Sequence, residues 1–506
     1  MSIPRNLSKV ADNVDANGVL AVSGGGTGTT TPSIVAGTNV TVTGTWPNQT
    51  INSSGGGGSA ATPTALGTVY GGTSSGSPFT TSLGYQSGNS NTGEFNTMLG
   101  WQAGKTNTSG NRNTFVGMYA GVFNTTGVMN SFVGGMDTPG YGAGHSNTTG
   151  SYNTALGTAA LAFNTTASGN TAVGYQAAYS NTSGTQNVAV GYKSLYANNA
   201  AGNPGSYSTA VGYQTLLNAT GGQNTAIGRM SLQALTTGSG NTGVGVNTLY
   251  SATTLTNNVA VGDGALFSNT VGNNNVAIGS NTLNSSNSVY AANCSVVGYQ
   301  SGYSNTTGGN LVSLGYRALY SNTTGNDNVA LGVNALFGVT SGSNNIGIGL
   351  EGGKNITTGN ANTVIGTATN GGTYNPVFNV TTESNRVVMS HNQVSNAYIQ
   401  VAWTVVSDSR DKINFAPVPH GLDFVNKLNP VQYQFRNNRN SEETNGPVRY
   451  GFKAQEVLAL EGENPVIIDN EDSEKLRMTD AYMIPILVKA IQELKAEFDA
   501  YKVSHP

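Results

Sequence analysis

Most of the chain alternates short runs of β-branched and small apolar residues with turns of Asn, Thr, Ser and Gly. A representative unit starts at residues 170–174, Asn-Thr-Ala-Val-Gly, and continues through Tyr175 and the small pair Ala177-Ala178 to the turn at residues 181–184. Short apolar runs bounded by such turns are typical of β-strands. Each unit therefore predicts one short strand that ends at a glycine.

The glycine that ends each predicted strand recurs with a regular spacing. Eleven of the sixteen intervals are 17 residues, two are 16, and the longer ones are 23, 21 and 19 residues. A period of this length that persists over many units indicates a repeat architecture. The glycines stand at positions 84, 100, 117, 134, 157, 174, 191, 212, 228, 245, 262, 279, 298, 315, 332, 349 and 366.

A single unit of this size cannot bury a hydrophobic core, whereas stacked units share a continuous one. We therefore expect a mainly β protein in which residues 81–370 form the shaft, a β-solenoid or β-roll with one rung per unit. Rungs at a strand spacing of about 4.8 Å would give a shaft roughly 80 Å long. Because the shaft is thin and carries few charges, we expect it to bury surface against copies of itself in an elongated homotrimeric fibre.

The pattern changes at both ends of the shaft. Residues 1–58 contain short β-prone segments and end in four glycines, which suits an attachment segment followed by a linker at residues 59–80. Residues 371–406 leave the repeat and are rich in predicted strands, so we expect a β-rich tip there. Residues 407–506 have ordinary globular composition and form the last predicted domain, a small α+β unit.

A helix with one apolar face is predicted at the end of this domain. We expect Asp480 to cap the helix, and Pro485 is compatible with its first turn. Apolar residues at steps of three and four are typical of a coiled-coil seam, along which we expect three copies of the helix to pack. The seam consists of Ile484, Leu487, Ile491, Leu494, Phe498 and Tyr501.

Charge is concentrated outside the shaft. The chain has 21 basic and 24 acidic residues, of which 15 lie in positions 1–370, and its net charge is −3. We expect no nucleic-acid partner, because phosphate binding needs clustered lysine and arginine. No apolar run is long enough for a membrane span, and none follows the amino terminus as in a signal peptide. We therefore expect neither membrane insertion nor secretion by the usual route.

The shaft sequence offers little chemistry beyond binding. Its few carboxylates do not form a pair of the kind that glycoside hydrolases use, and no two of the four histidines are near in sequence. We expect no metal site and no cofactor. The single cysteine, Cys294, excludes an intrachain disulfide and stands where most repeats carry a polar residue, which indicates a structural thiol.

Insertions and aromatic residues are the candidates for receptor binding. The aromatic residues that follow the repeat glycine suit packing between rungs or chains better than sugar stacking. The two largest insertions interrupt the shaft surface, so Tyr141 and His145 in the first and residues 197–207 in the second are candidates. Tyr374 and Trp403 in the β-rich tip are further candidates, although Trp403 suits a buried trimer core better.

Ser407 opens the last domain, and Lys412 follows five positions later. A lysine removed from water can be neutral and accept the proton of a serine hydroxyl, so this pair is a possible nucleophile and base. By spacing alone, two solvated loop residues explain the pair better. A strand or a helix would separate the two side chains, so either a turn brings them together or the lysine comes from a neighbouring chain. The charges between them, Asp408, Arg410 and Asp411, either orient the pair or, more simply, bind one another.

Three motifs follow one another in residues 379–498. They are Trp403 with Ser-Asp-x-Arg-x-Lys at 407–412, Tyr-Gly-Phe-x-Ala-Gln-Glu-Val at 450–457, and Val-Lys-Ala-Ile-Gln-Glu-Leu at 488–494. This segment resembles the intramolecular chaperone domain at the carboxyl end of phage tailspikes and tail fibres, as in endosialidase. In that family the domain assists trimer assembly and then cuts itself off with a serine and lysine dyad. The resemblance implies that Ser407 is the nucleophile, Lys412 is the base, and the bond between Val406 and Ser407 is cut.

The resemblance also implies a function for the whole chain. We expect a tail fibre of the virion that is assembled in the host cytoplasm, joins a tail or baseplate protein through its amino terminus, and binds a polysaccharide or protein on the host surface. One alternative is a tailspike that depolymerises such a polysaccharide. Another is a bacterial trimeric adhesin, which would need a signal peptide and a membrane-anchoring barrel, and neither is expected from this sequence.

Overall fold

The computed structural model describes residues 40–43, 50–53, 79–138, 140–197, 206–369, 371–394, 397, 400, 407–436 and 439–505. The chain divides into two compact units, Met1–Leu66 and Gly67–Pro506. In the first unit, β1 (Val40–Thr43) and β2 (Thr50–Ser53) pair as antiparallel strands. β1 lies in one of the segments that the sequence marks as β-prone.

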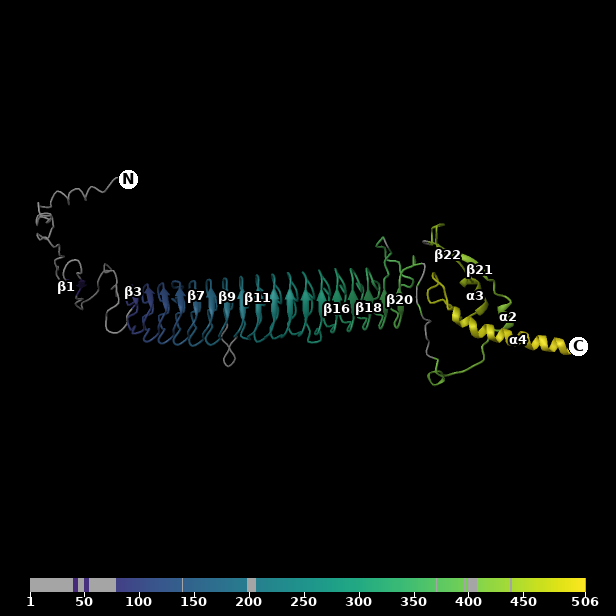
Figure 1. Ribbon diagram of the computed structural model, residues 1–506, viewed down its shortest axis with the longest axis horizontal. Coiled ribbons are helices and arrows are strands. Elements are labelled where there is room, and N and C mark those ends of the chain that lie inside the picture. The colour runs from purple at the N-terminus through teal and green to yellow at the C-terminus, as the bar shows by residue number, and fades with distance from the viewer. Residues whose placement is uncertain are drawn as a thin grey trace, which may run out of the picture. The chain divides into compact units, whose positions relative to one another are not determined.

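The shaft is a β-solenoid built on one parallel sheet (Figure 1). Among the described residues, 18 strands of three residues pair in chain order from β3 to β20. Paired residues lie one repeat apart, as Thr154 with Thr171 and Thr171 with Val188. Each repeat unit therefore forms one rung, which confirms the predicted β-solenoid.

The strands of the shaft from β3 to β19 each end directly before a repeat glycine, and β20 ends before Ser390. They are β3 (Thr81–Leu83), β4 (Thr97–Leu99), β5 (Thr114–Val116), β6 (Ser131–Val133), β7 (Thr154–Leu156), β8 (Thr171–Val173), β9 (Val188–Val190), β10 (Thr209–Val211), β11 (Thr225–Ile227), β12 (Thr242–Val244), β13 (Val259–Val261), β14 (Val276–Ile278), β15 (Ser295–Val297), β16 (Val312–Leu314), β17 (Val329–Leu331), β18 (Ile346–Ile348), β19 (Thr363–Ile365) and β20 (Val387–Met389).

The middle residue of each strand lines the interior of the solenoid. In β7, Ala155 is fully buried, whereas Thr154 and Leu156 are exposed. Larger side chains from the turns, such as Leu161 and Leu195, are also fully buried and belong to the same core. A continuous row of apolar side chains therefore runs from rung to rung, so each rung depends on its neighbours for stability.

From Gly84 to Gly332, the glycine at the end of each strand stands where no side chain fits. A Cβ added at Gly174 would lie 2.6 Å from the carbonyl oxygen of Gly191 on the next rung, and Gly174 has a φ of +126°. Residues with a Cβ rarely adopt this conformation. The regular spacing of glycine in the sequence thus reflects the close stacking of the rungs.

Two adjacent glycines provide a test of this stacking. We expect Gly134→Ala to lower the unfolding temperature, because its Cβ would lie 2.3 Å from the carbonyl oxygen of Gly157. The expected loss of unfolding free energy is about 2 kcal/mol or more, as at other sites where the backbone is strained. Gly135→Ala is the matched control, since an added Cβ there has no atom within 4 Å. Thermal unfolding followed by circular dichroism compares the two variants, and equal midpoints would contradict this account.

Two rows of buried asparagines connect the rungs. In the row that precedes the strands, the backbone N–H of Asn170 donates to the side-chain oxygen of Asn153 at 2.9 Å. In the row within the turns, the amide nitrogen of Asn124 donates to Asn107, and that of Asn147 donates to Asn124 at 2.6 Å. These bonds satisfy buried polar groups and fix the register between successive rungs.

Cys294 replaces an asparagine in the row that precedes the strands. Its backbone N–H donates to the side chain of Asn275 as an asparagine would, and its thiol lies 3.7 Å from the carbonyl oxygen of Gly308. Burial raises the pKa of this thiol to about 11, although backbone hydrogen bonds oppose the effect. The cysteine therefore fills a structural position, as its place in the repeat predicted.

The C-terminal domain combines short strands with helices. β21 (Val431–Arg436) and β22 (Thr444–Gly451) form an antiparallel hairpin, and β23 (Ile468–Asp469) pairs with β24 (Arg477–Met478). The helices are α2 (Leu422–Val425), α3 (Ala454–Glu461) and α4 (Met483–Ser504), and the 3-10 turns are η2 (Ser409–Asp411) and η3 (Asp480–Tyr482). Its buried core consists of Phe424, Val457, Ile467, Ile468, Met483 and Ile486.

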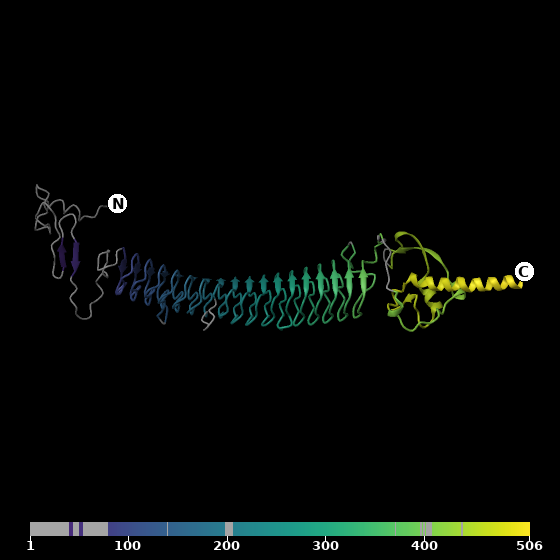
Figure 2. The ribbon, with the colours of Figure 1, turned by 60° about the horizontal axis from the view of Figure 1, so that its bottom comes forward.

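The long helix α4 starts two residues later than an Asp480 cap would place it. The prediction of that cap was wrong, because Asp480 lies in η3 and Tyr482 occupies the cap position of α4. A cap at Asp480 would put Pro485 in the second turn, where its missing N–H and its ring disrupt the helix. With Met483 as the first residue, Pro485 remains in the first turn. Figure 2 shows that the end of α4 extends beyond the rest of the domain. Among the described residues, no helix is long and apolar enough to cross a bilayer.

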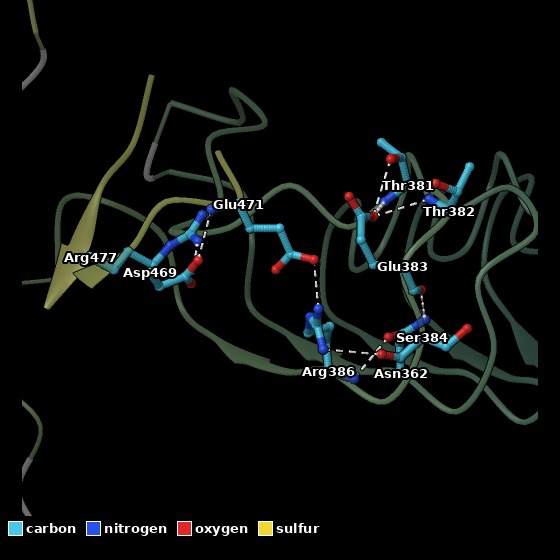
Figure 3. A network of polar contacts seen from close by, with 9 residues as sticks. All are labelled: Asn362, Thr381, Thr382, Glu383, Ser384, Arg386, Asp469, Glu471 and Arg477. Carbon is cyan, nitrogen blue, oxygen red and sulfur yellow. Dashed lines mark hydrogen bonds and ion pairs between the residues drawn. The ribbon is translucent and has the colours of Figure 1, made fainter. Parts of the chain in front are cut away.

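A network of charged residues lies at the end of the solenoid (Figure 3). Glu383 accepts hydrogen bonds from the two backbone N–H groups just before it, and although burial alone would raise its pKa, these bonds lower it. Arg386 pairs with Glu471 of the C-terminal domain at 2.6 Å, and Asp469 pairs with Arg477 at 2.9 Å. Of these contacts, only the pair of Arg386 and Glu471 joins the end of the solenoid to the C-terminal domain. Because a partly exposed ion pair contributes only about 0–1 kcal/mol, it does not by itself fix the domain to the shaft.

Candidate functional site

A 3-10 turn brings Ser407 and Lys412 together. The carboxylate of Asp408 accepts the backbone N–H of Arg410 at 2.8 Å and so starts η2. After this turn, Nζ of Lys412 donates a hydrogen bond to Oγ of Ser407 at 2.6 Å. In an extended strand, residues five apart would point to opposite faces. The turn within one chain is therefore sufficient for the contact, and no lysine from a neighbouring chain is required.

Asp408 and Arg410 bind each other beside this contact. The guanidinium of Arg410 lies 2.6 Å from the carboxylate of Asp408. The side-chain and backbone hydrogen bonds from Arg410 lower the pKa of Asp408, and the same pairing raises the pKa of Arg410. The simpler of the two roles expected for these charges, mutual pairing, is the one that the structure contains. Among the described residues, Lys412 has no carboxylate partner and is directed at Ser407 instead.

The contact between Ser407 and Lys412 is exposed to solvent in a single chain. The apolar residues that follow it, Ile413 and Phe415, are 83% and 73% exposed. A lysine in water stays protonated, whereas a lysine moved into an apolar environment favours the neutral amine that can accept a proton. The described part of one chain therefore has the geometry of a serine and lysine pair without the dry surroundings that such a base needs.

The predicted coiled-coil residues lie on the outer face of α4. The inner face packs on the domain through Met483, Ile486 and Ala490, which are buried. A long apolar row in contact with water is typical of a surface that binds a partner. The exposed row consists of Ile484, Leu487, Ile491, Leu494 and Phe498, with Tyr501 at its end.

The other predicted site residues have different outcomes. Trp403 and Val406 lie outside the described residues, as do positions 198–205 of the second insertion. Tyr374 has a structural contact, since its Oη donates to the side chain of Asn379 at 2.9 Å, and burial raises its pKa to about 12. Within the described ranges, no three His, Cys, Asp or Glu side chains are grouped so that they could hold a metal ion.

Tyr141 and His145 lie at a groove on the shaft with a volume of about 530 Å³. Both residues were predicted from the sequence, whereas Lys105, Tyr119 and Phe123, which come from neighbouring rungs, were not. The repeat could have shown that Lys105 and His145 are equivalent. Each lies two residues before a turn asparagine, so the two residues occupy the same position in their units and line up along the shaft. The groove is lined by Gln102, Lys105, Thr106, Tyr119, Val122, Phe123, Met136, Gly140, Tyr141 and His145.

Comparison with known proteins gave a match for one part of the chain, the start of the C-terminal domain. Neither a search of curated proteins nor a search of solved structures gave a significant match. Among protein families, the model described as the chaperone of endosialidase matches residues 407–464. This match begins at Ser407 and includes the motif at 450–457, so it confirms the resemblance found in the sequence. The C-terminal segment 407–464 is therefore similar to the endosialidase chaperone family, and this similarity implies autoproteolytic serine peptidase activity.

Proposed function

We propose that the protein is a homotrimeric tail fibre of a bacterial virus that processes itself. Its chaperone domain promotes assembly of three chains and then cuts the bond between Val406 and Ser407. The β-solenoid remains in the virion, joins a tail or baseplate protein through its amino terminus, and binds a polysaccharide or protein on the host surface. The observation that carries this proposal is the 2.6 Å contact between Lys412 and Ser407 at the first residue of the family match.

The proposed cleavage follows from the chemistry of this pair. Oγ of Ser407 attacks the carbonyl carbon of Val406 while Lys412, as a neutral amine, takes the hydroxyl proton. The peptide C–N bond then breaks, the proton passes to the nitrogen of Ser407, and an ester joins Val406 to the Ser407 oxygen. Water hydrolyses this ester, which leaves a carboxylate on Val406 and restores the hydroxyl of Ser407.

Assembly provides the switch in this proposal. The contact is exposed in one chain and lacks the apolar surroundings that favour a neutral lysine, so a chain that has not assembled is not cut. A neighbouring chain that covers Ile413 and Phe415 would remove water from the same region and favour the neutral amine. Cleavage would then mark correct folding, and the chaperone domain would be released only from a finished fibre.

The proposal is tested on the purified full-length chain by intact mass and light scattering. We expect the wild type to form a trimer and to yield two fragments, residues 1–406 and 407–506. The fragments should appear together with the trimer during refolding, because burial of the site follows assembly. A stable trimer that keeps all 506 residues would contradict self-cleavage, and fragments from a monomer would contradict its dependence on assembly.

A further inference from the structure

We propose that the groove beside the first insertion binds a carboxylate-bearing sugar, such as a uronic or sialic acid unit of a host polysaccharide. The aromatic rings of Tyr119, Phe123 and Tyr141 would contact the sugar ring, and Lys105 would bind its carboxylate. The inference rests on the proposed function in one respect, namely that the fibre binds a glycan on the host surface. It goes further by assigning the site and the chemical class of the ligand.

The groove exists because the repeat is interrupted at this point. The interval between Gly134 and Gly157 is 23 residues, six more than the usual repeat. β6 and β7 nevertheless pair in register, with Ser131 opposite Thr154, so the extra residues leave the ladder and lie on the surface. Insertions that do not serve the repeat are where a solenoid most often carries specific contacts.

The inserted segment is held in place by a buried carboxylate. Asp137 is only 6% exposed, and its Oδ1 accepts the backbone N–H of Tyr141 at 2.9 Å. Its Oδ2 accepts a hydrogen bond from the side chain of Gln176 at 3.1 Å, and its own N–H donates to the carbonyl of Tyr141 at 3.2 Å. Because both carboxylate oxygens are occupied within the shaft, Asp137 shapes the groove and does not offer a free anion to a ligand. A site that is shaped before binding loses less entropy when a ligand enters.

Aromatic residues from two neighbouring rungs meet at the groove around His145. The ring of His145 lies edge-on to Phe123 and to Tyr141, each with centroids 5.0 Å apart, and to Tyr119 at 6.2 Å. Phe123 is 48% exposed, and Tyr119 and Tyr141 are partly exposed, so ring surface at the groove is open to a ligand. Rings with one open face pack well against the C–H face of a sugar, and the Tyr hydroxyls provide polar contacts at its rim.

Charge favours an acidic sugar over a neutral one. In the described shaft residues, Arg112, Lys193 and Arg317 lie over aromatic rings and Lys354 pairs with Glu351, whereas the ammonium of Lys105 contacts neither a ring nor a carboxylate. Lys105 lines the groove together with His145. Burial lowers the pKa of His145 although the charge of Asp137 opposes this, so the imidazole is neutral at pH 7 and suits hydroxyl groups. Lys105 is thus the group that would distinguish a carboxylate from a hydroxymethyl group.

Saturation-transfer NMR on the fibre formed by the full-length chain tests this site with four compounds. Three are the sodium salts of acidic sugars, namely glucuronate, galacturonate and N-acetylneuraminate, and the fourth is the neutral sugar glucose. Glucuronate and glucose differ at one carbon, which carries a carboxylate in the former and a hydroxymethyl group in the latter. We expect transfer to at least one of the three acids and less to glucose. Lys105→Met should weaken binding of that acid about tenfold, as for loss of one charge-assisted hydrogen bond. Phe123→Ala should remove the signal, and Lys193→Met, which changes a shaft lysine outside the groove, should not affect it.

Each result decides for or against the acidic-sugar site. The inference is overturned if none of the three acids gives transfer, if glucose gives as much transfer as glucuronate, or if Lys105→Met and Lys193→Met behave alike. It is also overturned if Phe123→Ala breaks the trimer in light scattering, since the groove would then be an interface between chains. Self-cleavage is measured separately by mass, so failure of the sugar site leaves that part of the proposed function standing, and failure of cleavage leaves the sugar result standing.

Discussion

A Ser407→Ala chain is expected to keep all 506 residues after it has assembled, whereas the wild type is cut between Val406 and Ser407. The change removes the Oγ that lies 2.6 Å from the Lys412 amine, and no atom of alanine can form the ester. Loss of a nucleophile slows comparable reactions by more than about 10³-fold. Intact mass after refolding measures the effect, because only the cut chain yields a fragment of residues 407–506.

Matched variants separate the role of the dyad from damage to the fold. Ser409→Ala changes an exposed serine in the same turn and should leave cleavage as in the wild type. Lys412→Arg keeps a cation that can donate to Ser407, but a guanidinium does not lose its proton in proteins, so this variant should also remain uncut. Cleavage of Ser407→Ala at the wild-type rate would exclude Ser407 as the nucleophile. Cleavage of Lys412→Arg would show that the lysine positions the serine but is not the base.

The shaft could be predicted from the sequence because every rung repeats the same local conditions. Gly174 is a glycine because a Cβ there would meet the carbonyl oxygen of Gly191 on the next rung, one repeat of 17 residues later. This steric requirement is visible in the spacing of glycine alone. The inward position of residues such as Ala155 follows from the alternation along a strand. Where one physical rule acts at each unit, a single chain provides as many observations as it has repeats.

The remaining features depend on contacts that local patterns do not report. Lys105 and His145 reach the same groove from different rungs, and the six-residue insertion between those rungs hides their equivalence. The start of α4 depends on how Pro485 is accommodated, which outweighs the capping preference of Asp480. The turn between Ser407 and Lys412 was required by their proposed chemistry, but the sequence did not show that Asp408 would cap it. Nor did it show that the pair would be open to water.

Ile491→Glu is expected to abolish both the trimer and the cleavage. Ile491 is 66% exposed in a single chain and lies in the middle of the apolar row on the outer face of α4. In a coiled coil of three chains the substitution would place three carboxylates near one axis, and burying each without a partner costs several kcal/mol. Light scattering should report a monomer. Intact mass should report the uncut chain of 506 residues, because the contact between Ser407 and Lys412 then stays exposed and lacks the apolar surroundings that such a base needs.

Ala496→Glu is the control for this substitution, because it adds the same charge to the same helix on a side away from the seam. It should leave both the trimer and the cleavage unchanged. Three results would each reject a different step of the argument. A trimer with Ile491→Glu would mean that the outer face of α4 is not the interface. A monomer that is still cut would mean that burial by a neighbouring chain is not what activates Lys412. An uncut trimer would mean that assembly does not suffice, and that α4 also acts on the geometry of the turn at Ser407.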